Sequence, residues 1–207
     1  MIAVIDYGMG NLRSVQKALE VVGAKAKVTQ DPKDLKKAEK IVFPGVGAFG
    51  EAMKELKRLD LAGPIRDSIR QGKPFLGLCL GLQLLFEYSE EAPGVKGLCV
   101  LKGDSKRFKF KGEALKVPHM GWNNIVKGSA AKGQGSSILK GVPPGSFMYF
   151  VHSYYVKPED KRIVLTTTDY GIEFTSGICK ENIYGFQFHP EKSQTIGLKI
   201  LENFVRM

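Results

Sequence analysis

The sequence is poor in cysteine, histidine and tryptophan. Its 207 residues include three cysteines, three histidines and one tryptophan. An odd number of cysteines without metal-ligand spacing argues against both a disulfide framework and a zinc site, so we expect no metal and no other cofactor. Cys99 and Cys179 are expected to pack inside strands, which leaves Cys79 as the cysteine to examine for chemistry.

The chain also lacks long apolar runs. No stretch approaches the roughly 18 apolar residues that a membrane span requires. The N-terminus runs directly into the apolar segment Met1–Ile5, without the basic segment and longer apolar run of a signal peptide. These two absences favour a cytoplasmic protein with no membrane partner.

Acidic residues are few relative to basic ones. Lys and Arg number 31 against 21 Asp and Glu, which gives a formal net charge of +10. Such a balance suits nucleic acid, an anionic substrate or an acidic partner face. The densest basic stretch, Lys102 to Lys116, is interleaved with Phe108 and Phe110, as in a half-exposed strand or hairpin. A single-strand nucleic-acid platform has a similar composition. We predict a solvated hairpin and no nucleic-acid partner.

Strand-like and helix-like patterns alternate over the first 90 residues. Strand-like segments cover residues 2–5, 25–29, 41–43 and 74–78; helix-like segments cover 12–22, 49–61 and 64–71, with a short helix opening at 31–32. After residue 90 come strand-like runs at 99–101, 147–151, 154–156, 163–168 and 178–188, a loop at 128–137 and a final helix at 196–205. We predict an α/β fold in one domain, residues 1–207. It has three layers, with a mixed, mainly parallel central sheet flanked by helices and an antiparallel C-terminal portion.

Residues 74–83 join a buried strand to a helix that we expect from Gly81 onward. Gly77 to Gly81 form a G-x-C-x-G pattern, the cysteine form of a nucleophile elbow, in which flanking glycines let the backbone bend sharply. The helix dipole would favour a Cys79 thiolate, and the backbone N–H of Leu80 would be free to bind a developing oxyanion. Taken alone, the pattern also fits a packed cysteine at a strand end.

A nucleophilic thiolate needs a base, and the base needs an orienting group. His189 and Glu191 lie two residues apart in the last strand-like run, so in an extended segment they project to the same side. Cys79, His189 and Glu191 therefore supply a nucleophile, a general base and acid, and an orienting carboxylate.

With these motifs the sequence resembles the class I, triad-type glutamine amidotransferases over nearly its whole length. The resemblance rests on the elbow, on the stretch His189–Ser193, and on Pro44–Gly47, which is similar to the oxyanion strand of the family. It implies that the backbone of Gly45, Val46 and Gly47 supplies a second oxyanion donor. From the residues alone, an ordinary strand-to-helix turn remains an alternative for Pro44–Gly47.

Three further segments make the sequence similar to the amidotransferase subunits of imidazole glycerol phosphate synthases. They are Asp6–Asn11, Pro118–Asn123 and Tyr149–Tyr154. This resemblance implies that glutamine is hydrolysed to glutamate and ammonia. It also implies a (β/α)₈-barrel cyclase partner that receives the ammonia and makes imidazole glycerol phosphate and an aminoimidazole carboxamide ribotide in histidine biosynthesis.

The same resemblance assigns binding and interface residues. The residues expected to hold glutamine are Gln83, Glu91, His152, Ser153 and Tyr154. The residues expected to touch the partner are Asn11, His119, Met120, Trp122, Tyr149 and Lys192. Structural alternatives remain open: Gln83 as a cap of the elbow turn, Glu91 as half of a solvated acidic pair with Glu90, His152 as a satisfied strand histidine, and Met120 and Trp122 as core residues.

Three rival functions remain open. One is an amidotransferase subunit of another synthase, which would share the triad. Another is a stand-alone γ-glutamyl hydrolase or cysteine peptidase, which would need no partner. The third is a noncatalytic basic binding module, for which residues 102–116 are the only support and against which an intact triad argues.

Overall fold

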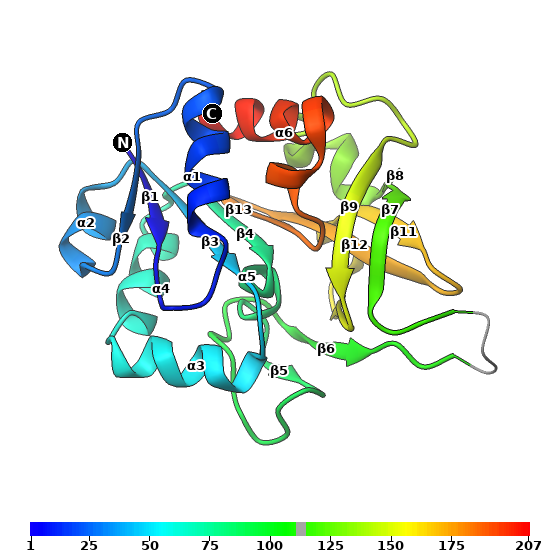
Figure 1. Ribbon diagram of the computed structural model, residues 1–207, viewed down its shortest axis with the longest axis horizontal. Helices are drawn as coiled ribbons and strands as arrows, with labels where there is room; N and C mark the ends of the chain where they lie inside the picture. The colour runs from blue at the N-terminus through cyan, green and yellow to red at the C-terminus, as the bar shows by residue number, and fades with distance from the viewer. Residues whose placement is uncertain (111–114) are drawn as a thin grey trace.

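A computed structural model describes residues 1–110 and 115–207 of the chain (Figure 1). Its main sheet follows the order β2-β1-β3-β4-β13-β12-β10-β6-β5, and β7 and β9 form a second sheet. The five strands at one end of the main sheet are β2 (Ala26–Thr29), β1 (Ile2–Ile5), β3 (Lys40–Gly45), β4 (Phe75–Cys79) and β13 (Ile183–Phe186). All neighbours among these five are parallel. The predicted parallel half of the sheet is therefore present.

Helices cover both faces of this parallel part, as Figure 1 shows. The helices are α1 (Leu12–Val21), α2 (Pro32–Lys37), α3 (Phe49–Arg58), α4 (Ala62–Arg70) and α6 (Gln194–Arg206). Neighbouring strand residues point to opposite faces. Ile41 and Phe43 accordingly join one core cluster with residues of α3 and α4, whereas Val42 joins another with residues of α1 and α6. The result is three layers with two cores, as predicted.

The other end of the main sheet is mainly antiparallel. It contains β12 (Glu173–Lys180), β10 (Tyr154–Pro158), β6 (Gly103–Arg107) and β5 (Tyr88–Ser89), with β11 (Val164–Asp169) beside β12 and β8 (Val126–Lys127) beside β11. The second sheet pairs β7 (His119–Asn124) with β9 (Phe147–His152) in antiparallel register. Four 3₁₀ turns are η1 (Ser129–Lys132), η2 (Gln134–Ser136), η3 (Lys161–Ile163) and η4 (Pro190–Lys192). The predicted loop at 128–137 thus contains two short turns.

Two local predictions around the elbow were wrong. The helix after Cys79, α5 (Leu80–Gln83), is a single turn. It stops because the next backbone N–H groups leave the helical pattern: those of Leu85 and Phe86 donate to carbonyls only three residues back, and that of Glu87 donates to the Gly103 carbonyl at 3.1 Å. The predicted strand at 99–101 is a bend in which Cys99 has a positive φ of 52° and is exposed. Cys179 is buried in β12, as expected.

Two strand predictions are refined by the pairing. The run 178–188 is divided between β12 and β13 by a turn at Glu181, whose φ is 52°. The basic stretch contributes β6, a half-exposed strand that pairs with the distant β10 and with β5. The predicted hairpin is therefore wrong for the described residues of this stretch. Residues 111–114 of the predicted hairpin lie outside the described residues.

Candidate active site

Cys79 lies at the sharp turn between β4 and α5. Its backbone has φ 53° and ψ −108°, a conformation that costs a non-glycine residue roughly 1–3 kcal/mol. The flanking glycines allow close packing around this turn: a methyl group on Gly81 would overlap the carbonyl of Phe43, and one on Gly77 would lie 3.0 Å from the nitrogen of Leu82. The geometry is that of the predicted nucleophile elbow. Because α5 has only one turn, its macrodipole contributes less than a long helix would.

His189 and Glu191 form a hydrogen-bonded pair beside this turn. His189 Nδ1 lies 2.9 Å from Glu191 Oε1, and their side chains are 6% and 2% exposed. The carboxylate reaches the imidazole because residues 190–192 form the 3₁₀ turn η4, not the extended segment that we expected. The turn is fixed by Ser193, whose Oγ donates to the His189 carbonyl at 2.7 Å.

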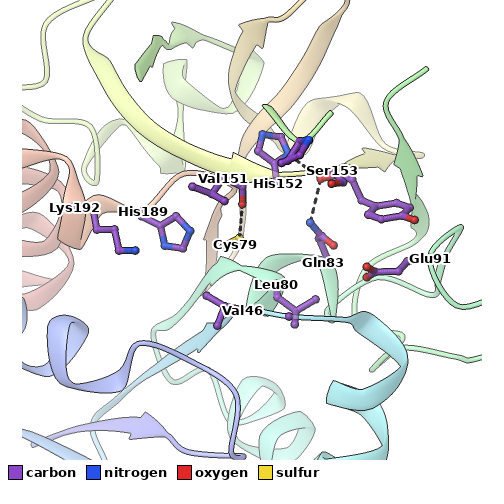
Figure 2. Close-up of a pocket in the computed structure, with 13 residues that line it drawn as sticks. Val46, Cys79, Leu80, Gln83, Glu91, Val151, His152, Ser153, His189 and Lys192 are labelled. Carbon is purple, nitrogen blue, oxygen red and sulfur yellow. Dashed lines mark hydrogen bonds between the residues drawn. The ribbon is translucent and has the colours of Figure 1, made fainter. Parts of the chain in front are cut away.

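The imidazole of His189 is directed toward Cys79 (Figure 2). Burial by itself would lower the pKa of His189, because it disfavours the charged form. The hydrogen bonds and negative charges of Cys79 and Glu191 outweigh burial and raise this pKa to about 10. The site therefore holds a proton on His189 next to the sulfur of Cys79.

A cavity of about 320 Å³ opens at Cys79 and His189. Its walls are Val46, Gly47, Cys79, Leu80, Gln83, Glu91, Pro118, Val151, His152, Ser153, Tyr154, His189 and Lys192. All five residues expected to hold glutamine therefore surround one space next to the sulfur. Gly45 is not among these lining residues, but it is in register with Cys79 on the neighbouring strand.

Gln83 and Glu91 do not follow the structural alternatives that we considered. Gln83 Nε2 donates to the Tyr154 carbonyl at 3.1 Å and to Gln187 Oε1 at 3.1 Å, so Gln83 is not a cap of the elbow turn. Glu91 Oε2 accepts from the backbone N–H of Phe49, the first residue of α3, at 2.8 Å. Glu90 instead accepts from the backbone of Arg107. The two carboxylates therefore accept from different backbone N–H groups and do not form the acidic pair that we considered.

His152 is both a satisfied strand histidine and a wall of the cavity. Its Nδ1 lies 2.8 Å from the Tyr154 carbonyl and donates to it, so its Nε2 accepts from His119 Nδ1 at 3.0 Å. His119 Nε2 in turn lies 3.3 Å from Asn123 Nδ2. Burial lowers the pKa of His152 to about 3 and that of His119 to about 4. Both imidazoles are therefore neutral, in contrast to that of His189.

His119 does not lie on a partner surface, contrary to our expectation. It is 2% exposed, because alternate residues of β7 point to opposite faces and His119 belongs to the inner one. Met120 and Trp122 belong to the outer face, with exposed fractions of 62% and 47%. The alternative of Met120 and Trp122 as core residues is therefore excluded.

The family whose description is "Glutamine amidotransferase class-I" matches residues 3–207. The chain belongs to the class I glutamine amidotransferases. It is 54% identical over 204 residues to imidazole glycerol phosphate synthase subunit HisH of Aquifex aeolicus, covering 98% of this chain and 95% of that protein. It is 50% identical over 210 residues to the subunit of the same name from Geobacter sulfurreducens, covering 100% and 98%.

Solved structures of other amidotransferases share the fold. A crystal structure of a glutamine amidotransferase superposes with a TM-score of 0.75 at 17% identity and covers 100% of both chains. The structure of PurLQS from Thermotoga maritima gives a TM-score of 0.71 at 18% identity and covers 99% of this chain and 97% of that one. At these identities the likeness concerns the fold alone.

Of the remaining interface candidates of this amidotransferase, Asn11 and Lys192 are exposed and Tyr149 is half-buried. Asn11 is exposed and makes no side-chain cap to α1. Lys192 is exposed as well, with its Nζ 5.9 Å from the ring centre of Tyr149, which lies opposite Trp122 in the second sheet. Lys192 lines the cavity, so Tyr149 lies beside a residue of the cavity wall.

The basic stretch of this amidotransferase is partly neutralised by its neighbours. Lys106 Nζ lies 2.7 Å from Asp104 and 3.6 Å from Glu90, and Lys109 Nζ lies 3.6 Å from Glu90. Phe108 is buried, so it does not offer a face on which a base could stack. These contacts argue against a nucleic-acid platform at this stretch.

Within residues 1–110 and 115–207, no group of three or more His, Cys, Asp or Glu side chains is placed to hold a metal ion. In the same ranges, no helix combines the length and apolar character needed to cross a membrane.

Gln187 is an active-site residue that our sequence analysis missed. It is fully buried, and its Nε2 lies 3.6 Å from Cys79 Sγ while its Oε1 accepts from Gln83. The sulfur also lies 3.8 Å from the carbonyl of Val151, the dashed contact in Figure 2. The sequence did contain one indication of this position. Gln187 precedes His189 by two residues, and residues two apart in an extended segment project to the same side.

Replacing Gln187 by methionine removes the amide donor at the sulfur with little change in volume. The substitution removes the hydrogen bond that holds the sulfur in place and the acceptor that orients Gln83. We therefore expect glutaminase kcat/KM, measured from glutamate release, to fall about 10-fold, the equivalent of one lost buried hydrogen bond. The matched variant Gln16→Met, on the surface of α1, should keep the wild-type kcat/KM. An unchanged kcat/KM in Gln187→Met would contradict this role.

Proposed function

We propose that this chain is the glutaminase subunit of an imidazole glycerol phosphate synthase. The observation that carries the proposal is the His189–Glu191 pair directed at Cys79 over a cavity lined by the expected glutamine contacts. The names of relatives about 50% identical over nearly the whole chain favour this synthase over the other synthases that class I amidotransferases serve. Residues 1–207 act as one amidotransferase unit in the cytoplasm.

The first half-reaction forms a thioester. The Cys79 thiolate attacks the carboxamide carbon of glutamine, and the carbonyl oxygen becomes an oxyanion. The N–H of Leu80 and the backbone of Gly45–Gly47 stabilise that oxyanion. His189 gives its proton to the departing nitrogen, so ammonia leaves and a γ-glutamyl thioester remains on Cys79.

The second half-reaction consumes water. The now neutral His189 takes a proton from water as its oxygen attacks the thioester carbon. Collapse of the second tetrahedral intermediate breaks the carbon–sulfur bond, releases glutamate and restores the Cys79 thiolate with a protonated His189. Glu191 stabilises the imidazolium in the resting state and holds its orientation throughout.

Glutamine carries an ammonium, a carboxylate and a carboxamide, and the cavity offers a group for each. The side chain of Glu91 suits the ammonium, since only its Oε2 is engaged with Phe49. The amide oxygen of Gln83 is oriented because its nitrogen donates twice. The segment His152–Tyr154 closes the opposite side of the cavity around the amino-acid portion of the substrate.

The partner is a (β/α)₈-barrel cyclase that receives the ammonia. Ammonia released beside Lys192 would be lost to solvent unless another chain covers the mouth of the cavity. The outer face of the β7–β9 sheet suits a partner, because Met120, Trp122 and Phe147 expose large apolar surfaces there. Tyr149 and Lys192 extend this surface with polar groups, and we propose that the exposed Asn11 touches the partner as well. The net charge of +10 favours an acidic partner face.

The Trp122→Ala variant should bind the cyclase more weakly. Exposed tryptophans at interface centres lose about 2 kcal/mol or more of binding free energy when truncated, roughly 30-fold in Kd. Titrating the cyclase into the variant by calorimetry measures this loss. Tyr88→Ala, which removes an exposed aromatic side chain from β5, is the matched control and should bind normally. Equal affinities of the two variants would exclude the β7–β9 face as the interface.

The proposed function is tested by the stoichiometry of the reaction. With glutamine, the ribonucleotide substrate and the barrel cyclase, we expect one glutamate per cyclised product and little free ammonium. Accumulation of ammonium without cyclised product would favour a stand-alone hydrolase. Absence of glutamate would exclude the amidotransferase chemistry.

A further inference from the structure

The hydroxyl of Tyr7 is a buried donor that has no hydrogen-bond partner among the described residues. Tyr7 follows β1 and is fully buried, with its ring packed on Phe43 at a centroid distance of 5.3 Å. A buried hydroxyl without a partner costs stability, so its presence calls for a reason other than stability. Phenylalanine would fill the same space without that cost.

This hydroxyl lies against the strand that leads to the oxyanion segment. A methyl group on Gly45 would overlap the Tyr7 oxygen and would lie 3.0 Å from Leu80 Cβ. Gly45 is in register with Cys79, and the next two residues, Val46 and Gly47, line the cavity. The Tyr7 hydroxyl is therefore within reach of the peptide between Gly45 and Val46.

The N–H and C=O of one peptide point in opposite directions. When the N–H of Val46 faces the oxyanion in the cavity, the carbonyl of Gly45 must face the protein interior. A carbonyl turned into the interior needs a donor. The glycine at 45 and the φ of +99° at Gly47 give this segment the freedom to adopt such an arrangement.

We propose that Tyr7 is a positioning residue for glutamine hydrolysis, whose hydroxyl donates to the Gly45 carbonyl while the Val46 N–H faces the oxyanion. The inference rests on the proposed function, because the oxyanion forms only when Cys79 attacks a carboxamide. Tyr7 is not among the residues that line the cavity and acts through the backbone of β3.

The test compares Tyr7→Phe with Thr168→Val, each in the complete complex with the cyclase and its ribonucleotide. Thr168 is a matched control, because its buried hydroxyl on β11 also lacks a partner among the described residues. We expect Tyr7→Phe to lower glutaminase kcat about 10-fold or more, since misplacing one oxyanion donor costs on the order of 10²–10³. KM should change less than about 3-fold, the melting temperature should not fall, and Thr168→Val should keep the wild-type kcat.

Alkylation of Cys79 by iodoacetamide separates positioning from a general structural role, because that displacement forms no oxyanion at a carbonyl. Tyr7→Phe should alkylate at the wild-type rate, measured on the Cys79 peptide by mass spectrometry. An unchanged kcat, or a parallel fall in kcat and alkylation, would overturn the assignment of Tyr7. If the wild-type complex showed no glutaminase activity, the proposed function itself would fail, and the role of Tyr7 with it.

Discussion

Replacing Cys79 by alanine should abolish the use of glutamine while the complex keeps cyclising its ribonucleotide with added ammonium salts. The variant retains the elbow, the cavity and the outer face of the second sheet, so only the nucleophile is lost. Loss of a nucleophile lowers kcat by about 10⁴-fold or more. The measurement is glutamate release and cyclised product, each followed with glutamine and then with an ammonium salt.

Cys99→Ala is the matched control for this variant. Cys99 is an exposed, free cysteine in a bend away from the cavity, so its loss should leave both reactions intact. Continued glutamine consumption by Cys79→Ala would show that another residue is the nucleophile. Loss of the ammonium-dependent reaction would show that the substitution disturbs the partner interface instead.

The Glu191→Gln variant should show the second largest fall in glutaminase kcat. Its carboxylate orients His189 at 2.9 Å and is one of the groups that raise the pKa of His189 to about 10. The amide has nearly the same shape but no charge. We expect kcat to fall by roughly 10²–10⁴-fold, as when the orienting carboxylate of a catalytic triad is neutralised.

The pH dependence of kcat tests the same role of Glu191, because the direction of its shift can be predicted. His189 must carry a proton to release ammonia, so activity falls as pH rises through the His189 pKa. Without the negative charge of Glu191 this pKa is lower, and the alkaline limb of kcat should move to lower pH. The control is Glu202→Gln on α6, which removes a surface carboxylate paired with Lys199 and should not move the limb. An unshifted limb in Glu191→Gln would contradict the assigned role.

The sequence was sufficient to predict the elements whose patterns are local. The glycines around Cys79 indicate a sharp turn because a side chain at Gly81 has no room beside the Phe43 carbonyl. The alternation of strand and helix segments up to residue 90 predicts the parallel half of the sheet. The pairing of β13 with β4 then brings His189 to the elbow, although the two residues are far apart in the chain.

Features that depend on contacts between distant segments were harder to predict. α5 ends early because the backbone N–H of Glu87 donates to the distant Gly103 carbonyl instead of extending the helix, and no local sequence pattern indicates that hydrogen bond. The contact of Gln187 with Cys79 depends on the placement of two strand ends. Alternation along β7 was sufficient to predict that His119 lies on the opposite face from Met120 and Trp122. The sequence did not show which of these two faces packs inward, so the burial of His119 was not predicted.

The most direct measurement is the glutaminase activity of the purified chain, alone and mixed with the barrel cyclase from the same source in the presence of its ribonucleotide. Misplacing one oxyanion donor costs on the order of 10²–10³ in rate, so a chain whose Gly45–Gly47 segment is set by the partner should be nearly idle alone. We predict stimulation of about that size in the complex. Full activity of the isolated chain, unchanged by the cyclase, would contradict the account and indicate a stand-alone hydrolase.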